Sequence, residues 1–220
     1  MSSYLTREEY FDAWARWHGG TDPRSSAVVR GWLTLAHTLS RPAAGLSPTV
    51  VTATGLLVAF SAVVPAAAGG WWLVAAGLLV GLSGLLDSLD GALAIAGGRA
   101  SRRGYVLDSA ADRLTEVGYA LALWLAGAPA WLAVVFGALC WFPDYLRARA
   151  GQAGVDETGA ISVWERPTRV AMTGMTLGGA GVVSALGAAG PVVAAGAAVG
   201  AVLGVVGTAQ LGRQLRRALG

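Results

Sequence analysis

Two pairs of aspartates lie close together near the middle of the chain. Asp87 and Asp90 are three residues apart, and Asp108 and Asp112 are four residues apart. Because residues at these spacings share one face of an α-helix, each pair presents two carboxylates side by side. Hard divalent cations such as Mg²⁺ prefer oxygen ligands and are commonly bound by carboxylates together with substrate phosphates. The spacing therefore predicts a divalent metal site that acts on a phosphorylated substrate.

The number of carboxylates favours two metal ions. Two ions about 3.5 to 4 Å apart share such a cluster and clamp a phosphoryl group during its displacement. Gly91, directly after Asp90, and Gly104, four residues before Asp108, leave the backbone open to a phosphate or nucleotide. Four carboxylates in one place repel one another unless cations neutralise them. We therefore expect two Mg²⁺ or Mn²⁺ ions at Asp87, Asp90, Asp108 and Asp112.

The aspartates stand in apolar surroundings, which makes their presence informative. An Asp at the centre of a bilayer costs about 2.5 to 3.5 kcal/mol on insertion scales, so four of them indicate a function. Two other interpretations stay open: a path for ions through a divalent-cation transporter, and a structural set of ion pairs. Transporters often show corresponding halves with broken helices, a symmetry that we do not find in this sequence. The arginines that would form structural pairs are Arg99, Arg102, Arg103 and Arg113.

The composition predicts an all-α integral membrane protein. Of the 220 residues, 55% are hydrophobic and 13% are charged, whereas a soluble domain carries about 25% charged residues. A helix needs about 20 mostly apolar residues to cross a bilayer. Six stretches meet that requirement and predict six transmembrane helices, at 49–68, 71–95, 105–127, 129–147, 168–187 and 191–211.

The charges predict how the chain lies in the membrane. All 16 basic residues are arginines, and they stand at the ends of apolar segments rather than in the basic stripe of a nucleic-acid-binding protein. The connections at 69–70, near Pro129 and at 188–190 carry no charge. Under the positive-inside rule, both termini are cytoplasmic. We expect a multi-pass protein of the cell membrane, with its active site facing the cytoplasm and no nucleic acid as partner.

Residues 1–45 predict an N-terminal region of amphipathic, juxtamembrane helices, distinct from a membrane domain at 46–220. Thr6 and Glu9 form a capping-box pattern at a helix start. An aromatic stripe follows at helical spacing, typical of a helix in the membrane interface, at Tyr10, Trp14 and Trp17. Packing against a partner domain is the alternative. Neither histidine has metal-ligating neighbours in the sequence, so we expect surface or interface positions for His18 and His37.

Several glycines recur four residues apart in the apolar stretches. Such spacings let helix backbones approach closely in lipid, within one bundle or between two copies of a chain. Packing within the bundle is the simpler interpretation. The residues concerned are Gly77 with Gly81, Gly174 with Gly178, and Gly196, Gly200 and Gly204.

The aspartate region resembles a known family signature. The order is Asp87-x-x-Asp90-Gly91-x-x-Ala94, then Gly104-x-x-x-Asp108-x-x-x-Asp112. It resembles the pattern D-x-x-D-G-x-x-A-R-x8-G-x-x-x-D-x-x-x-D of the CDP-alcohol phosphatidyltransferases. One position departs from the pattern, because Ile95 stands where the family has an arginine that helps to bind the nucleotide donor. Arg99, one helical turn later, is the candidate replacement.

The resemblance continues from about Leu46 to Arg169. Pro48-Thr49-x-x-Thr52-x-x-Gly55 is similar to the family's P-N-x-x-T-x-x-G. The segments 145–150 and 165–169 are similar to those that flank the acceptor pocket in members using phosphorylated alcohols, such as phosphatidylinositol phosphate and phosphatidylglycerophosphate synthases. The resemblance implies a six-helix membrane fold, commonly a homodimer, with a cavity open to the cytoplasm.

The resemblance also implies a reaction: transfer of a phosphatidyl group from CDP-diacylglycerol to an alcohol hydroxyl, with release of CMP. Asp87 and Asp108 would bridge two metal ions, Asp90 would complete one site, and Asp112 would complete the other and act as the base. For Ser101, an ordinary loop role is the alternative. The residues that match donor nucleotide-binding positions or adjoin them are Thr49, Thr52, Gly91, Ala94, Arg99, Ser101 and Gly104.

Three arginines are the candidates for binding the acceptor: Arg147, Arg166 and Arg169. Guanidinium groups suit bidentate recognition of phosphate, so we expect a small phosphorylated alcohol such as inositol phosphate or glycerol 3-phosphate. Arginines also belong at cytoplasmic helix ends for reasons of topology alone. The same chemistry on a non-phosphorylated or lipid alcohol is therefore the alternative.

Overall fold

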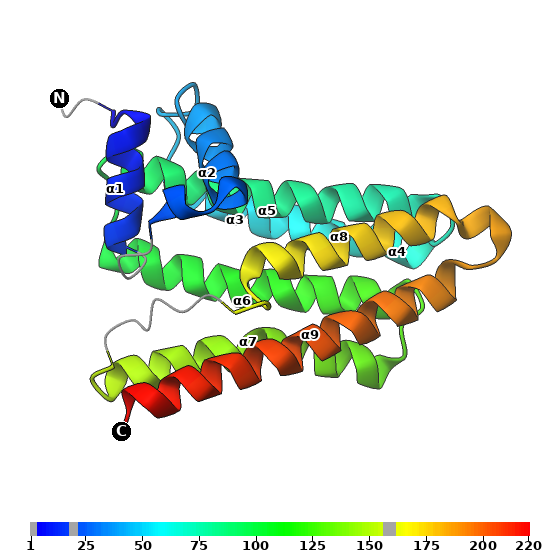
Figure 1. Cartoon of the computed structure of the whole chain (residues 1–220). Helices are drawn as coiled ribbons and strands as arrows, with labels where there is room; N and C mark the ends of the chain where they lie inside the picture. The colour runs from blue at the N-terminus through cyan, green and yellow to red at the C-terminus, as the bar shows by residue number, and fades with distance from the viewer. Residues whose placement is uncertain (1–3, 18–21, 156–161) are drawn as a thin grey trace. The chain divides into compact units, whose positions relative to one another are not determined.

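The computed structural model describes residues 4–17, 22–155 and 162–220, all of them helical or in connecting turns, with no strand among them. His18 lies outside the described residues. The elements in chain order are α1 (Arg7–Trp17), the 3₁₀ helix η1 (Pro23–Ser25), α2 (Ala27–Ser40), α3 (Pro48–Ser61), α4 (Val63–Ala68), α5 (Trp72–Ala96), α6 (Arg102–Leu125), α7 (Ala130–Gln152), α8 (Arg166–Val182), the 3₁₀ helix η2 (Ser184–Leu186) and α9 (Ala189–Ala218) (Figure 1).

Three helical segments of the described chain are long and apolar enough to cross a membrane: Pro48–Ala68, Trp72–Ala96 and Ala189–Ala218. The all-helical, membrane-compatible class predicted from composition is therefore confirmed. The other three predicted spans overlap α6, α7 and α8.

The uncharged connections between the predicted spans are tight turns. Gly69 ends α4 with φ +67°, and its N–H donates to the carbonyls of Pro65 and Ala66. Gly127, with φ +119°, lies in the turn between α6 and α7. Positive φ values are readily adopted by glycine because it has no Cβ. These turns bring successive apolar helices close together without placing a charge between them.

The chain forms two compact units. Unit 1 comprises residues 1–55 and 84–111, and unit 2 comprises residues 56–83 and 112–220. The helices α3, α5 and α6 each continue from one unit into the other, since the boundaries fall inside them. The two units are described separately below.

In unit 1, α1 and α2 pack on the C-terminal part of α5. The predicted capping box is confirmed: the Thr6 N–H donates to Glu9 Oε2 at 2.8 Å, and the Glu9 N–H donates back to Thr6 Oγ1 at 3.4 Å. The hydrogen bonds from the Thr6 backbone and hydroxyl lower the pKa of Glu9. Trp32 Nε1 on α2 donates to Ser88 Oγ on α5 at 2.8 Å. The buried apolar core of this unit is Tyr10, Phe11, Leu33, Ala36, Ala92 and Ala96.

The predicted aromatic stripe of α1 is divided between the inside and the outside of unit 1. Tyr10 is buried in the core, whereas Trp17 is 45% exposed. His37 is only 4% exposed, so the expected surface position is wrong, because α2 turns its ring into the core. Its Nε2 lies 2.9 Å from the Leu5 carbonyl oxygen, and the ring stacks on Tyr10 with centroids 5.2 Å apart.

In unit 2, α9 lies along α7 and α8 (Figure 1). Trp164, just before α8, is fully buried at the centre of these helices and meets the Phe136 ring edge-on at 5.5 Å. Gly200 and Gly207 of α9 make room for it, because a Cβ at Gly207 would lie 2.5 Å from Trp164 Cβ and a Cβ at Gly200 2.6 Å from Phe136. Gly200 belongs to the predicted small-residue spacing and packs within the bundle, as expected, whereas Gly207 was not part of that prediction.

The glycines of α5 and α8 provide a second close approach in unit 2. A Cβ at Gly77 would lie 2.5 Å from the carbonyl oxygen of Gly174 and 2.7 Å from the backbone nitrogen of Gly178. Backbone atoms cannot swing aside as a flexible side chain can. The two helices therefore pack at a distance that only glycine at position 77 permits.

We expect Gly77→Ala to destabilise the protein, because the added methyl group forces α5 and α8 apart. Overpacking of this kind costs about 1 to 3 kcal/mol, which lowers Tm by roughly 2 to 12 °C for a chain of this size. Gly81→Ala is the matched control, one turn along α5, since no described atom lies within 4 Å of a Cβ built there. Thermal unfolding in detergent measures both. Equal Tm values for the two variants would contradict the close-packing account.

Candidate active site

Three of the predicted metal ligands converge in unit 1. Asp87 and Asp90 lie near the end of α5, and Asp108 lies in the first turns of α6. Carboxylate oxygens of Asp87 and Asp108 lie within 4.8 Å of each other. Asp90 interacts electrostatically with both and is only 4% exposed. The structure thus brings together two carboxylate-bearing helix faces that the sequence places eighteen or more residues apart.

The donor set fits a hard cation. The buried Asp90 Oδ2 has no hydrogen-bond partner among the described residues. A buried carboxylate oxygen is costly to leave unsatisfied, and a bound cation removes that cost. All three residues offer only oxygen ligands, the type that Mg²⁺ and Mn²⁺ favour. Asp87, Asp90 and Asp108 are therefore able to hold such an ion.

Asp112 lies one helical turn after Asp108 on the continuous helix α6, at the start of unit 2. Residues four apart on a helix share a face. Within unit 2, Asp112 Oδ1 forms an ion pair with Arg166 Nη2 at 2.9 Å, and Asp112 Oδ2 lies 3.6 Å from Arg113 Nη2. The last aspartate of the pattern is therefore the one in contact with an arginine predicted to bind the acceptor.

Two predicted donor-binding residues also begin α6. Ser101 stands immediately before the helix, and its Oγ accepts a hydrogen bond from the Gly104 N–H at 3.0 Å. This is an N-cap, which satisfies one of the free N–H groups of the first turn. A Cβ at Gly104 would approach Ser101 Oγ to 3.1 Å, so glycine fits this cap closely. Together they fix where α6 starts, and hence in which turn of the helix Asp108 lies.

The arginine expected to replace the family's missing one is engaged elsewhere in unit 1. Arg99 donates from Nη1 to the Leu46 carbonyl at 2.7 Å and from Nη2 to the Ala44 carbonyl at 3.0 Å. Its N–H also donates to the Ala94 carbonyl at 2.8 Å. Ile95, at the family's arginine position, packs against the apolar core of unit 1. In this structure Arg99 anchors the turn that precedes α3.

The remaining donor-binding candidates lie on α3 and α5. Thr52 interacts with the Asp90 carboxylate, while its hydroxyl donates to the Pro48 carbonyl at 3.0 Å. Thr49 is exposed at the start of α3. A Cβ at Gly91 would have no described atom within 4 Å, so the backbone there is open to a ligand. Thr52 and Gly91 therefore both adjoin Asp90.

The three predicted acceptor arginines all lie in unit 2, in different environments. Arg147 pairs with Asp144 at 3.0 Å and with Glu165 at 2.5 Å, and its side chain is 29% exposed. Arg166 is 17% exposed. Arg169 is only 1% exposed, which places its guanidinium inside the protein. Arg147 and Arg166 are accessible to a ligand, and Arg169 is not.

Sequence reasoning missed the acidic partners of these arginines. Four carboxylates and four arginines form a single network of ion pairs, and three of these carboxylates were not considered as ligands or partners. The carboxylates are Asp112, Glu116, Asp144 and Glu165, and the arginines are Arg113, Arg147, Arg166 and Arg169. One signal was available, because Glu116 lies four residues after Asp112 on the same helix. Asp144 also pairs with Arg113 and Arg169, from other helices, which no local spacing reveals.

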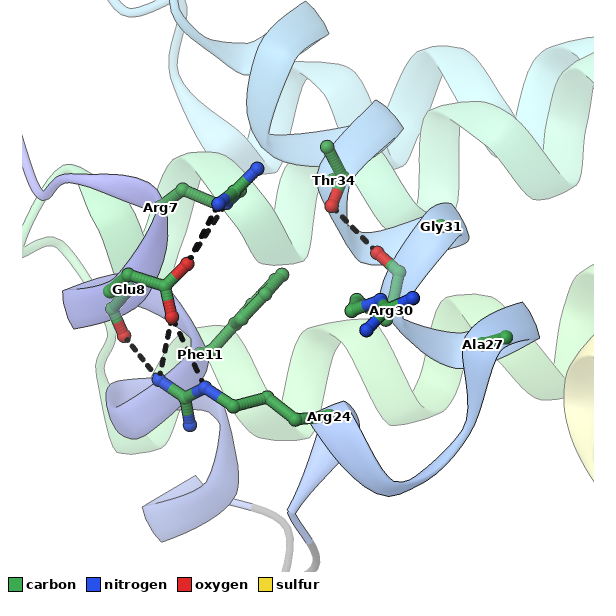
Figure 2. Close-up of a pocket in the computed structure, with 8 residues that line it drawn as sticks. All are labelled: Arg7, Glu8, Phe11, Arg24, Ala27, Arg30, Gly31 and Thr34. Carbon is green, nitrogen blue, oxygen red and sulfur yellow. Dashed lines mark hydrogen bonds and ion pairs between the residues drawn. The ribbon is translucent and has the colours of Figure 1, made fainter.

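A separate hollow of about 500 Å³ lies in unit 1 between α1, η1 and α2 (Figure 2). Arg24 spans it, over the ring of Phe11, and pairs with Glu8 at 3.1 Å and with Asp12 at 2.9 Å. Hydrogen bonds from Arg7 and Arg24 lower the pKa of Glu8. None of its lining residues was predicted as a site residue, and its charges are largely paired. The aspartate cluster is therefore the stronger candidate for chemistry.

These features define a helical, membrane-compatible protein with a cluster of carboxylates, able to hold a metal ion, near the ends of two helices. Residues 46–203 match the CDP-alcohol phosphatidyltransferase family over most of the chain. The chain belongs to this family. The resemblance inferred from the aspartate pattern is thereby confirmed.

The sequence is similar to two kinds of characterised relative. It is 31% identical to the phosphatidylinositol phosphate synthase of Mycobacteroides abscessus over 179 residues, which cover 77% of this chain and 70% of the relative. It is 38% identical to the archaetidylinositol phosphate synthase of Pyrococcus horikoshii over 99 residues, 44% of this chain and 52% of the relative. The match thus spans about half the length of that archaeal relative.

The fold is similar to two crystal structures of the phosphatidylinositol phosphate synthase of Mycobacterium tuberculosis. The structure with bound CDP-DAG has a TM-score of 0.65 and 26% identity, covering 83% of this chain and 94% of that one. The complex with manganese and citrate has the same TM-score and identity, covering 84% and 88%. A relative of similar fold therefore binds a divalent transition metal.

We expect Arg99→Ala to loosen the turn before α3, because the variant loses both hydrogen bonds to the carbonyls of residues 44 and 46. Amide hydrogen exchange in residues 41–47 should accelerate by roughly 5- to 10-fold. Arg102→Ala is the control, since it removes an exposed arginine three residues away. Unchanged exchange in Arg99→Ala would show that the guanidinium does not anchor this turn.

Proposed function

We propose that this protein transfers a phosphatidyl group from CDP-diacylglycerol to the hydroxyl of a small phosphorylated alcohol and releases CMP. The observation that carries the proposal is the convergence of Asp87, Asp90 and Asp108 in a chain of the CDP-alcohol phosphatidyltransferase family. The bound CDP-DAG of the mycobacterial relative supports the choice of donor.

The metal centre would hold two divalent ions, Mg²⁺ or Mn²⁺. Asp87 and Asp108 would be ligands shared by both ions, Asp90 would complete one site, and Asp112, from the next turn of α6, would complete the other. When bound, the ions neutralise the pyrophosphate of the donor and the phosphate of the departing CMP. The manganese in the mycobacterial relative and the fit of the oxygen ligands in unit 1 support this assignment.

Asp112 is the base of the reaction. Its carboxylate accepts the proton of the acceptor hydroxyl while that oxygen forms a bond to the phosphorus atom attached to diacylglycerol. The bond between this phosphorus and the bridging oxygen breaks, and CMP leaves with the electron pair. Arg166 contacts Asp112 at 2.9 Å and so stands where an acceptor must approach.

Donor binding involves the part of the aspartate cluster around Asp90. Thr52 and Gly91 adjoin Asp90 and are the best placed of the candidates. Ser101 and Gly104 contribute by fixing the start of α6, and Arg99 by anchoring the turn before α3. Thr49 and Ala94 complete the set of residues for which we propose a role in this region.

The acceptor carries a phosphate, as in inositol phosphate or glycerol 3-phosphate. Arg147 and Arg166 are the accessible guanidinium groups in unit 2, and bidentate arginines suit phosphate. The names of the mycobacterial and archaeal relatives, both inositol phosphate lipid synthases, support this choice. Transfer to a non-phosphorylated or lipid alcohol is the outcome that would contradict it.

In the membrane, we propose six spans formed by α3 with α4, α5, α6, α7, α8 and α9. Both termini and the aspartate cluster face the cytoplasm of a multi-pass cell-membrane protein, which acts as a homodimer. Residues 1–45 form an interfacial region beside a membrane domain at 46–220. The arginine distribution supports this topology, and the exposed Trp17 and Trp32 suit an interface.

We expect Asp87→Asn and Asp108→Asn each to reduce CMP release from CDP-diacylglycerol by at least about 100-fold, because each removes a negative ligand shared by both ions. Purified protein in detergent is assayed with Mg²⁺ and a phosphorylated acceptor. Asp12→Asn on α1 is the matched control and should retain full activity.

Turnover close to wild type in either ligand variant would refute the shared-metal mechanism. A wild-type protein that releases no CMP with any acceptor, yet carries Mg²⁺ or Mn²⁺ into proteoliposomes, would establish the transporter instead. The thermal stability of each variant, measured in parallel, separates loss of chemistry from loss of folding.

We expect Arg166→Ala to raise KM for the phosphorylated acceptor by about 10-fold or more, since a hydrogen bond to a charged group contributes about 1.5 to 3 kcal/mol. KM for CDP-diacylglycerol should change by less than about 2-fold. Arg149→Ala, at the exposed end of α7 where Arg149 bonds Gln152, is the control. Two results would contradict acceptor binding by these arginines: equal use of free inositol or glycerol by wild type, or an unchanged acceptor KM in Arg166→Ala. The arginines would then reflect only the orientation of the helices in the membrane.

A further inference from the structure

Unit 2 contains a fully buried carboxylate that the proposed mechanism does not use. Glu116 lies on α6 one turn after Asp112, and its side chain is 0% exposed. Its Oε1 lies 2.7 Å from Arg169 Nη1 and 4.0 Å from Arg166 Nη1, and its Oε2 lies 3.2 Å from Arg113 Nε. Three arginines from α6 and α8 thus surround one carboxylate.

The principal partner of Glu116 is buried to the same degree. Arg169 donates from Nε to the Trp164 carbonyl at 3.0 Å and from Nη1 to Glu116 at 2.7 Å and Asp144 at 2.8 Å. Trp164 is itself fully buried. Since Arg169 is only 1% exposed, its guanidinium has no open side on which a soluble phosphate could sit.

Two arginines that remain partly exposed, Arg113 and Arg166, lie between Glu116 and the proposed base. Arg166 reaches Glu116 with Nη1 and Asp112 with Nη2. Arg113 reaches Glu116 with Nε and Asp112 with Nη2. Neither contact with Glu116 is a hydrogen bond, and Arg166 donates instead to the Asp112 carbonyl at 3.4 Å and to Thr115 Oγ1 at 3.2 Å. Glu116 therefore attracts both guanidinium groups by its charge, from a position one turn along α6 from Asp112.

We propose that Glu116 and Arg169 form a buried positioning pair, which orients Arg113 and Arg166 beside Asp112 for an incoming phosphorylated acceptor. Neither member touches substrate. Arg169, one of the three arginines expected to bind the acceptor, acts instead through Glu116. This inference rests on the proposed function, because it assigns roles within the same acceptor site.

The physics of buried ion pairs supplies a discriminating test. Removing one member leaves an uncompensated buried charge, whereas replacing both with neutral groups of similar volume is often tolerated. If Arg169 acts only through Glu116, its replacement has no further effect on acceptor binding once Glu116 has been replaced. The loss of a direct substrate ligand instead adds to the effect of Glu116→Gln. The two roles are therefore distinguished by a double-mutant cycle.

The experiment compares wild type with Glu116→Gln, Arg169→Met and the double variant in full-length protein. CMP release is followed with glycerol 3-phosphate or inositol phosphate, whichever the wild type uses. We expect each single variant to raise the acceptor KM by about 10-fold or more, and the double variant to raise it no further than Glu116→Gln alone, within about 3-fold. KM for CDP-diacylglycerol should stay within about 2-fold throughout.

Tyr119→Phe is the matched control for a purely structural effect. Tyr119 is buried on α6 three residues after Glu116, and its hydroxyl hydrogen-bonds Ser83 Oγ at 2.7 Å. This variant should lower Tm without changing the acceptor KM. If Glu116→Gln behaves in the same way, with Tm reduced and acceptor KM unchanged, the positioning role is overturned.

A double variant whose acceptor KM is raised by about the product of the two single effects would also overturn the proposal and make Arg169 a direct ligand. Should Arg169→Met fail to fold, Arg169→Lys keeps the charge but cannot make the same set of hydrogen bonds. It should raise the acceptor KM and not the donor KM, and unchanged acceptor KM would count against the pair. Failure of the proposed function is a distinct result, in which wild type releases no CMP with either acceptor.

Discussion

Negative charge inside apolar helices must be compensated, and this constraint shapes both units of the protein. In unit 2, arginines from three segments provide the compensation, so that buried Glu116 is matched by equally buried Arg169. In unit 1, Asp87, Asp90 and Asp108 converge near the ends of two apolar helices. There the compensation that we propose is metal. Each cluster is costly alone and stable with its counter-charge.

The surrounding structure serves mainly to set the position of these charges. Tight glycine turns and an N-cap at Ser101 determine where the helices begin and end. Glycine contacts such as that of Gly77 with Gly174 allow α5 and α8 to pack with their backbones close together. Trp164, buried at the centre of unit 2, provides the carbonyl that holds Arg169. Packing in this protein is therefore closely tied to its electrostatics.

Features that depend on the spacing of nearby residues could be predicted from the sequence. Contacts between residues far apart in the chain could not. Carboxylates three or four residues apart identified the site, and the Thr6–Glu9 capping box was recognised because both partners lie within one turn. The burial of His37 depends on how α2 packs against α1, which no local pattern specifies. Two of the arginine partners of Asp144 lie on other helices, Arg113 on α6 and Arg169 on α8, and no local spacing reveals them.

If the aspartates bind two divalent ions, the number of Mn²⁺ ions bound per chain is the quantity to measure. Electron paramagnetic resonance of the purified protein, titrated with Mn²⁺ in the presence of CDP, gives this number without depending on turnover. We expect two bound ions in wild type and loss of binding in Asp87→Asn. Fewer than two bound ions in wild type, or undiminished binding in Asp87→Asn, would contradict the two-metal site.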